Sequence, residues 1–143
     1  MSLNLSYDDE NVFAKIIRGE MPKVTVYEDD HTLAFMDVFP QSEGHVLVIS
    51  KLSKSVNLCD LDEDEMCFTL RAAQKVARAV VKALAPDGFR LVQYNGEAAG
   101  QTVFHTHFHI IPVWEGRSLG RHGEGMASPE ELEAVAERIR HAL

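Results

Sequence analysis

The sequence has 143 residues, of which 45% are hydrophobic and 25% charged, the size and composition of one globular domain. Its net charge of -8 disfavours a surface that follows nucleic-acid phosphates, because such surfaces cluster Lys and Arg. No segment approaches the roughly 20 consecutive apolar residues of a membrane span. We therefore expect a single domain over residues 1–143 that binds neither nucleic acid nor membranes. A local pocket for a small phosphorylated ligand is compatible with this charge.

The N-terminal part of the chain predicts a short helix. Residues 1–11 are polar and acidic and lack the basic start and apolar stretch of a secretory signal, so we expect a cytoplasmic location. Phe13, Ile16 and Ile17 then recur at helical spacing, and Pro22 ends the pattern. This spacing predicts an amphipathic helix whose apolar face packs on another element.

Three segments rich in β-branched and aromatic residues follow this helix and predict strands. They cover residues 24–27, 32–38 and 45–49. Only short polar segments separate them, which is typical of antiparallel strands joined by tight turns.

The clearest periodic segment of the sequence predicts one long helix. Its apolar residues repeat at spacings of four and three, so that they share one helix face. Asp60 and Glu63 are placed to cap its N-terminus, and Pro86 follows its C-terminus. The predicted apolar face consists of Met66, Leu70, Ala73, Ala77, Val80 and Leu84.

The C-terminal half predicts two more strands and a terminal helix. The strands cover residues 89–94 and 104–113, and a glycine-rich stretch at 116–125 predicts a mobile loop. Ser128 and Pro129 are a capping residue and a first-turn proline that open the last helix. The element order predicts an α+β fold, an antiparallel sheet of about five strands with one long helix and short terminal helices.

Three histidines alternate with other residues in the last predicted strand. His105, His107 and His109 would leave one face of that strand, with neighbouring side chains roughly 7 Å apart. A single histidine on a sheet face is commonly structural, but three neighbouring imidazoles are costly to desolvate together. Two chemistries suit the trio: ligation of one zinc ion, or attack of an imidazole on phosphorus.

The loop before the histidines favours the phosphorus chemistry. It is small and rich in glycine and amide side chains, and backbone amides in such loops suit a phosphate. Taken alone it would be an ordinary hairpin loop, so its value comes from its adjacency to the histidines. The residues concerned are Asn95, Gly96, Gly100, Gln101 and Thr102.

The segment GQTVFHTHFHII at residues 100–111 resembles the signature of the histidine-triad (HIT) family, His-x-His-x-His with apolar spacers. Residues 13–20 and 35–41 are similar to the Hint-type branch of that family. The resemblance spans about residues 11–112 and implies a HIT-like fold and a nucleotide-hydrolysing enzyme. One departure is Tyr94, which stands where relatives often carry an amide side chain.

The resemblance also implies roles for four histidines. His107 would be the nucleophile, and His109 and His45 would assist and orient it. His105 would brace the strand and the phosphate site. His31, His122 and His141 match no site of the family, and we expect them to be solvated.

By the same resemblance, a set of residues near the N-terminal helix would bind the nucleoside. Asp37 would accept hydrogen bonds from the ribose hydroxyls, although a carboxylate before a turn can also be a solvated or capping group. Four apolar residues would flank the base, and their alternative role is ordinary core packing. They are Phe13, Ile16, Phe35 and Val38, and the phosphate would meet Asn95, Gly100, Gln101 and Thr102.

The implied reaction is cleavage at the α-phosphate of a purine nucleoside phosphoramidate or a dinucleoside polyphosphate. An AMP-like nucleotide would be released through a nucleotidyl-His107 intermediate, with no metal or cofactor required. The resemblance further implies a homodimer. Two alternatives are a nucleotide-binding sensor or scaffold with little turnover, and a zinc hydrolase that uses the three histidines as ligands.

Overall fold

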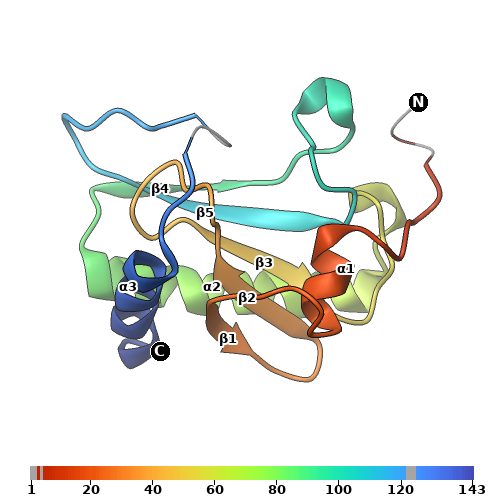
Figure 1. Ribbon diagram of the computed structural model, residues 1–143, viewed down its shortest axis with the longest axis horizontal. Helices are drawn as coiled ribbons and strands as arrows, with labels where there is room; N and C mark the ends of the chain where they lie inside the picture. Colours follow the sequence, from red (N-terminus) through yellow and green to blue (C-terminus); the bar gives the residue numbers. More distant parts are fainter. Residues whose placement is uncertain (1–2, 4, 122–124) are drawn as a thin grey trace.

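The computed structural model of the protein describes residues 3, 5–121 and 125–143, and it confirms the predicted α+β fold (Figure 1). One antiparallel sheet has the strand order β1-β2-β3-β5-β4. The predicted loop at residues 116–125 falls partly outside the described residues, at 122–124. The elements are α1 (Val12–Ile17), β1 (Thr25–Glu28), β2 (Thr32–Met36), β3 (Val46–Ser50), η2 (Leu58–Asp60), α2 (Glu63–Leu84), β4 (Gly88–Val92), η3 (Glu97–Ala99), β5 (His107–Val113) and α3 (Pro129–His141).

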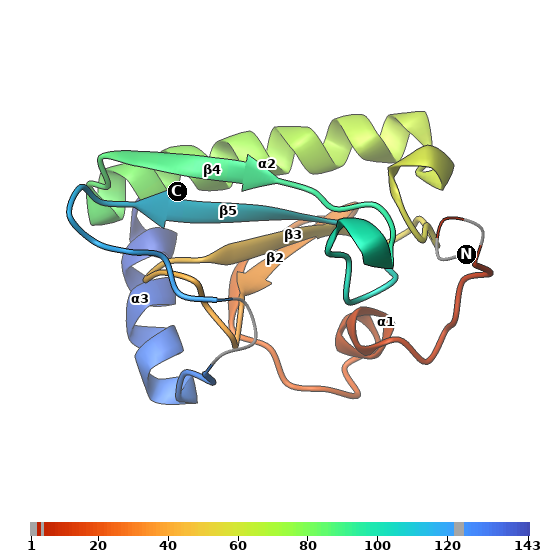
Figure 2. The same cartoon turned by 90° about the horizontal axis from the view of Figure 1, so that it is seen from above.

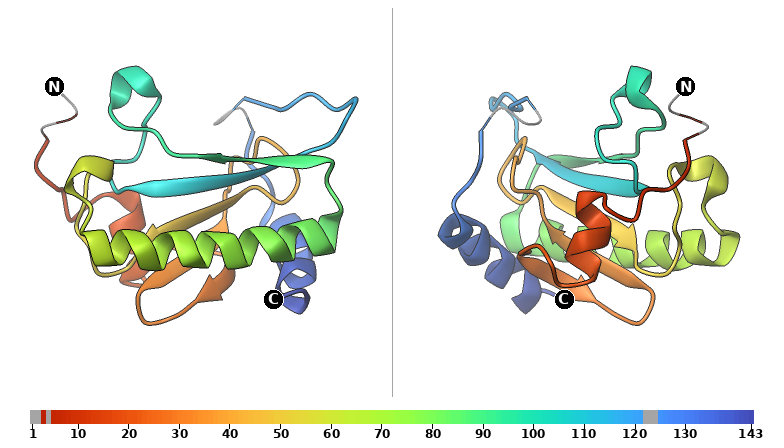
Figure 3. Two further views of the ribbon diagram at one scale, coloured as in Figure 1. Left: turned by 180° about the vertical axis from the view of Figure 1, so that it is seen from behind. Right: turned by 45° about the vertical axis from the view of Figure 1, so that its right-hand side comes forward.

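Helices cover both faces of the sheet, as Figures 2 and 3 show. The long helix α2 crosses one face, and α3 packs beside it, so that one apolar cluster joins the two helices to the sheet. The short helix α1 lies on the opposite face, where Phe13 and Ile16 pack on Phe35, Leu47 and Ile49. The molecule therefore has a larger core under α2 and a smaller one under α1.

Strand register assigns the histidines to the α1 face. In the β3–β5 ladder, Leu47 pairs with His109 and Ile49 pairs with His107. Leu47 and Ile49 belong to the apolar cluster under α1, whereas Phe108 belongs to the core under α2. Because side chains alternate along a strand, His107 and His109 project toward α1.

The structure corrects the predicted boundaries of three strands, and the strand predicted over residues 89–94 is β4, which ends at Val92. The last strand begins at His107, because the N–H of Thr106 donates to the Ser55 carbonyl (3.0 Å) and leaves the sheet ladder. His105 therefore precedes the strand instead of sharing its face. The second strand ends before Asp37, whose Oδ1 accepts the N–H of Phe39 (2.8 Å) and starts the following turn.

Helix α2 has a different N-terminal cap from the predicted one. It begins at Glu63, and Asp62 accepts backbone N–H groups from two first-turn residues, each at 3.1 Å. Asp60 instead forms a capping box with Asn57 at the preceding η2. The predicted cap was wrong because two acidic residues, two positions apart, offer similar cap signals.

The buried face of α2 is also rotated from the predicted one. Leu70, expected in the core, is 39% exposed, and Met66 is only half buried. Small residues form the contact instead, which lets the helix lie close to the sheet. The buried residues of α2 are Thr69, Ala72, Ala73, Val76, Ala77, Ala79, Val80 and Leu84.

The terminal helix begins as predicted. Ser128 accepts the N–H of Glu131 (3.2 Å), and Pro129 occupies the first turn. Of the three histidines expected to be solvated, His141 is exposed and His122 lies outside the described residues. His31 is not simply solvated, because its ring stacks on Phe68 with centroids 3.8 Å apart. Within the described part of the chain, α2 and the other helices are all too short or too polar to cross a bilayer.

Candidate active site

His107 is held in one orientation by the backbone just before it. Its Nδ1 lies 2.7 Å from the carbonyl oxygen of His105. A carbonyl oxygen can only accept, so the neutral His107 ring carries its proton on Nδ1. The lone pair is consequently on Nε2. The ring of Phe13 meets His107 edge-on, with centroids 4.9 Å apart, and fixes its plane.

A second chain of hydrogen bonds fixes His45 and His109. The backbone N–H of Gln41 donates to Nδ1 of His45 (3.0 Å), so the proton of His45 is on Nε2. That Nε2 lies 2.9 Å from Nδ1 of His109, which must accept. The neutral His109 ring therefore carries its proton on Nε2, and its centroid is 5.0 Å from that of His107. An unprotonated nitrogen and an N–H donor are thus placed side by side.

Asp37 lies beside this chain. The carboxylate is buried, and its Oδ2 is 3.4 Å from Nε2 of His45. Because an imidazole N–H is attracted by a carboxylate, Asp37 strengthens the preference of His45 for a proton on Nε2.

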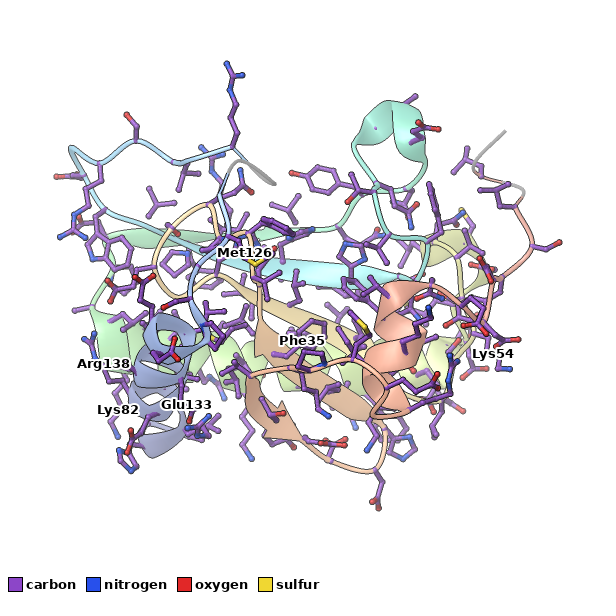
Figure 4. The ribbon with its side chains drawn as sticks, viewed as in Figure 1. Phe35, Lys54, Lys82, Met126, Glu133 and Arg138 are labelled. Carbon is purple, nitrogen blue, oxygen red and sulfur yellow. The ribbon has the colours of Figure 1, made fainter. Side chains whose placement is uncertain are left out.

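An apolar cavity of about 160 Å³ opens on one side of the histidines. It lies between α1 and the sheet, on the face from which Phe35 projects (Figure 4). The five residues predicted to bind the nucleoside all contribute to its wall. They are Phe13, Ile16, Phe35, Asp37 and Val38, and the wall also includes Thr102, His107 and His109.

A second cavity of about 190 Å³ is lined by the same two histidines. Its wall contains Gln41, Tyr94 and Gly100, and it shares Thr102, His107 and His109 with the apolar cavity. The ring of Tyr94 meets His109 edge-on, with centroids 5.5 Å apart. Because the shared residues separate an apolar space from a more polar one, a group bound at the boundary would contact both histidines.

His105 does not share the strand face of His107 and His109 that strict alternation predicted for it. Its ring lies away from both cavities, with Nε2 3.0 Å from the Ser50 carbonyl and Nδ1 2.7 Å from the Tyr7 hydroxyl. Burial above all, together with the neighbouring His107, lowers the pKa of His105 to about 4, although the hydrogen bond to the Ser50 carbonyl acts in the opposite direction. His105 is therefore a neutral ring at physiological pH and supports His107 through its carbonyl.

Two residues predicted to contact the phosphate use their side chains for hydrogen bonds within the protein instead. The Asn95 side chain accepts the N–H of Leu58 (2.8 Å) and bonds to Gln93. The buried Gln101 side chain bonds to Gly96 and to two carbonyls, and so braces the loop from inside. The N–H of Gly100 also donates within the loop, to Glu97 (3.0 Å). Of the predicted loop residues, Gly100 and Thr102 line cavities next to His107.

Sequence reasoning missed three residues near the site. Gln41 and Tyr94 line the second cavity, and Tyr7 bonds to His105. Tyr94 could have been singled out from the sequence, because it stands where relatives often carry an amide side chain. Gln41 acts through its backbone N–H, which donates to His45, and Tyr7 contacts a residue 98 positions away in the sequence. No local sequence pattern reveals either contact.

Spacing alone would permit a metal ion among the buried residues of the site. Ligand atoms of Asp37, His45 and His109 lie within 4.8 Å of one another. The Gln41 N–H, however, keeps the His45 proton on Nε2, the nitrogen that would have to bind the metal. The three-histidine alternative meets a similar obstacle, because both ring nitrogens of His105 are already hydrogen-bonded. These hydrogen bonds oppose zinc ligation by either set of residues.

Comparison with known proteins gives consistent results. The family model of the HIT domain matches residues 18–116. An adenylylsulfatase of Arabidopsis thaliana is 44% identical over 120 residues, which cover 78% of this chain and 59% of that protein. An adenosine 5'-monophosphoramidase of Schizosaccharomyces pombe is 36% identical over 134 residues, 90% of this chain and 94% of that protein. The crystal structure of a HIT-like protein from Bartonella henselae, 48% identical, superposes with a TM-score of 0.90 and covers 96% of this chain and 100% of that one.

Proposed function

This chain belongs to the HIT family, which includes nucleotide hydrolases, and from that premise we propose that it cleaves a purine nucleotide at its α-phosphate through a nucleotidyl-His107 intermediate. The observation that carries the proposal is the contact between Nδ1 of His107 and the His105 carbonyl, which places the lone pair on Nε2 of a residue that lines both cavities. The apolar cavity, with Asp37 in its wall, suits a nucleoside. The more polar cavity suits the leaving group.

In the first step, the lone pair of His107 Nε2 forms a bond to the α-phosphorus while the bond to the leaving group breaks. His107 keeps its Nδ1 proton, and the His105 carbonyl stabilises the positive charge that the adduct acquires. His109 donates a hydrogen bond from Nε2 to the leaving atom, where negative charge develops. Fixed dipoles thus stabilise both ends of the displacement.

In the second step, water attacks phosphorus, and the bond to His107 breaks. One water molecule is consumed overall: its hydroxyl ends on the nucleotide, and the proton that it releases to solvent balances the one that the leaving group takes up from solvent. Positioning and fixed donors can supply much of such catalysis, so the scheme requires no metal or cofactor.

The relatives suggest which substrates to test. The two named enzymes are an adenylylsulfatase and an adenosine 5'-monophosphoramidase, whose substrates both carry an adenylyl group on a small leaving group. We propose nucleoside phosphoramidates and dinucleoside polyphosphates as the substrate classes, with adenylyl sulfate as a third compound that the relatives add.

The test of this proposal is AMP release by the native chain from each of these compounds, with and without a chelator. We expect release from at least one compound at a rate that chelation leaves unchanged. Loss of activity on chelation would support the zinc alternative. Tight AMP binding without release from any compound would instead indicate a nucleotide sensor or scaffold.

We also propose that the protein is a homodimer joined along β4. This strand ends the sheet, so one side of its backbone has no strand partner among the described residues. Phe89 and Leu91 of β4 lie with Leu70 and Val81 of α2 along an exposed apolar groove. A second copy related by a twofold axis would pair the two β4 edges and cover both grooves.

The dimer predicts a clear effect of Leu91→Asp, because the carboxylate would be buried in the interface. We expect the native chain to sediment as a dimer and this variant as a monomer. Leu52→Asp is the matched control, since Leu52 is 60% exposed and lies away from β4. A native monomer at micromolar concentrations would contradict the proposal.

A further inference from the structure

Tyr7 reaches the active site from a segment that precedes the part of the chain matched by the HIT domain, residues 18–116. Its hydroxyl oxygen lies 2.7 Å from Nδ1 of His105, and the two rings meet edge-on with centroids 5.7 Å apart. His105 itself is buried. A tyrosine outside the matched domain therefore contacts one of the three triad histidines.

The direction of this hydrogen bond follows from the other side of the His105 ring. Nε2 of His105 faces the carbonyl of Ser50 at 3.0 Å and must donate to it. Nδ1 is then unprotonated, and the Tyr7 hydroxyl is the donor. Burial raises the pKa of that hydroxyl, so Tyr7 keeps the proton that it donates. One ring nitrogen of His105 therefore donates a hydrogen bond, and the other accepts one.

The consequence for His107 runs through the backbone of His105. The carbonyl of the same residue accepts the Nδ1 proton of His107 (2.7 Å), which leaves Nε2 as the nucleophilic atom. His105 lies in a bend before β5, where no sheet ladder holds its backbone. The N–H of the same peptide group, from Thr106, donates to the Ser55 carbonyl (3.0 Å), and the His105 ring, fixed at both ends, is the second anchor of this peptide. Loss of one ring contact would let the carbonyl move and loosen the orientation of His107.

Polar contacts hold the N-terminal segment in place. Asp9 forms an ion pair with Lys54 (2.8 Å), and its carbonyl accepts from Arg18 (2.6 Å). The Leu3 carbonyl accepts from the Asn57 side chain (3.2 Å). Figure 4 shows Lys54 beside this segment. Tyr7 therefore lies in a segment held against the domain, and Tyr7 and His105 both line a cavity of about 200 Å³.

We propose that Tyr7 is a positioning residue, which holds the His105 ring and thereby keeps the His107 proton on Nδ1 and its lone pair on Nε2. The inference rests on the proposed function, since it concerns the same nucleophile. It adds a residue from outside the matched domain to the catalytic apparatus.

The test removes one hydroxyl in Tyr7→Phe. The matched control is Tyr27→Phe, which also loses one side-chain hydrogen bond, from its hydroxyl to Asp29 (2.8 Å), but at an exposed place on β1. We expect Tyr7→Phe to lower kcat for AMP release about two- to tenfold with KM unchanged, in line with the loss of one hydrogen bond. Tyr27→Phe should match the native chain in both.

A spectroscopic readout separates positioning from general destabilisation. In ¹⁵N spectra of the imidazoles, Tyr7→Phe should move the Nδ1 signal of His105 toward that of an imine nitrogen without a hydrogen bond. It should also lower the population of the Nδ1-protonated form of His107. Unchanged His107 signals, or a kcat equal to that of Tyr27→Phe, would overturn the proposal. If the native chain releases no AMP, the proposed function fails, and the His107 signals still decide whether Tyr7 orients that ring.

Discussion

His107→Ala is expected to lower kcat for AMP release by at least about a thousandfold, because the variant lacks the atom that forms the bond to phosphorus. The side chain is buried between the two cavities, and its Nδ1 bond to the His105 carbonyl leaves Nε2 for the attack. Nucleotide binding should change far less than turnover, because the apolar cavity remains. The measurement is steady-state AMP release together with direct AMP binding to both proteins.

The control for this prediction is His141→Ala, which removes an imidazole from the exposed end of α3. It should leave both turnover and binding unchanged. If His107→Ala retained a tenth or more of the native kcat, water would be attacking phosphorus directly, and the nucleophile assignment would be wrong.

His109→Ala is expected to have an effect that depends on the leaving group. His45 fixes the His109 proton on Nε2, so this nitrogen is the donor available to a leaving atom. An amine leaving group develops much negative charge on nitrogen, whereas sulfate spreads its charge and leaves readily. Losing one such donor costs roughly a hundred- to a thousandfold where charge develops. We expect a loss of that size with adenosine phosphoramidate and a much smaller one with adenylyl sulfate.

The measurement compares kcat for the two substrates in the native chain and in His109→Ala. The leaving-group assignment requires the ratio of the two losses to be well above ten. Equal losses would place the His109 donor on the phosphoryl oxygens, which both substrates share. His141→Ala again serves as the control, because it removes an exposed imidazole at the end of α3 and should leave both rates unchanged.

The elements of the fold were predictable where one residue pattern dominated. Runs rich in β-branched and aromatic residues located the strands, helical spacing located α1 and α2, and the capping residues Ser128 and Pro129 located α3. The exact face of α2 was not predictable. Alanines that pack closely on a sheet carry a weaker hydrophobic signal than Leu70, which the structure leaves exposed.

The candidate site likewise has features that a local sequence pattern predicts and features that depend on contacts between distant segments. His107 and His109 share a strand face, so their proximity followed from a local pattern. The position of His105 could not be predicted from a local pattern, because it depends on the hydrogen bond from Thr106 to Ser55, two residues far apart in sequence. The resemblance likewise suggested a phosphate contact for Asn95, whose side chain the structure uses to hold a neighbouring loop.

Proton positions were the least predictable feature. They depend on which backbone group faces each ring nitrogen, such as the N–H of Gln41 at His45 and the carbonyl of His105 at His107. These contacts arise only once the loops are folded. They also carry the chemical argument, since they decide which nitrogen attacks and which one donates.

The central claim, a covalent intermediate on His107, is tested most directly by the stereochemical course at phosphorus. The substrate is a nucleotide made chiral at its α-phosphorus with sulfur, hydrolysed by the native chain in ¹⁸O-labelled water. Two successive in-line displacements, first by His107 and then by water, predict overall retention of configuration. Inversion would show a single displacement by water and would contradict the account.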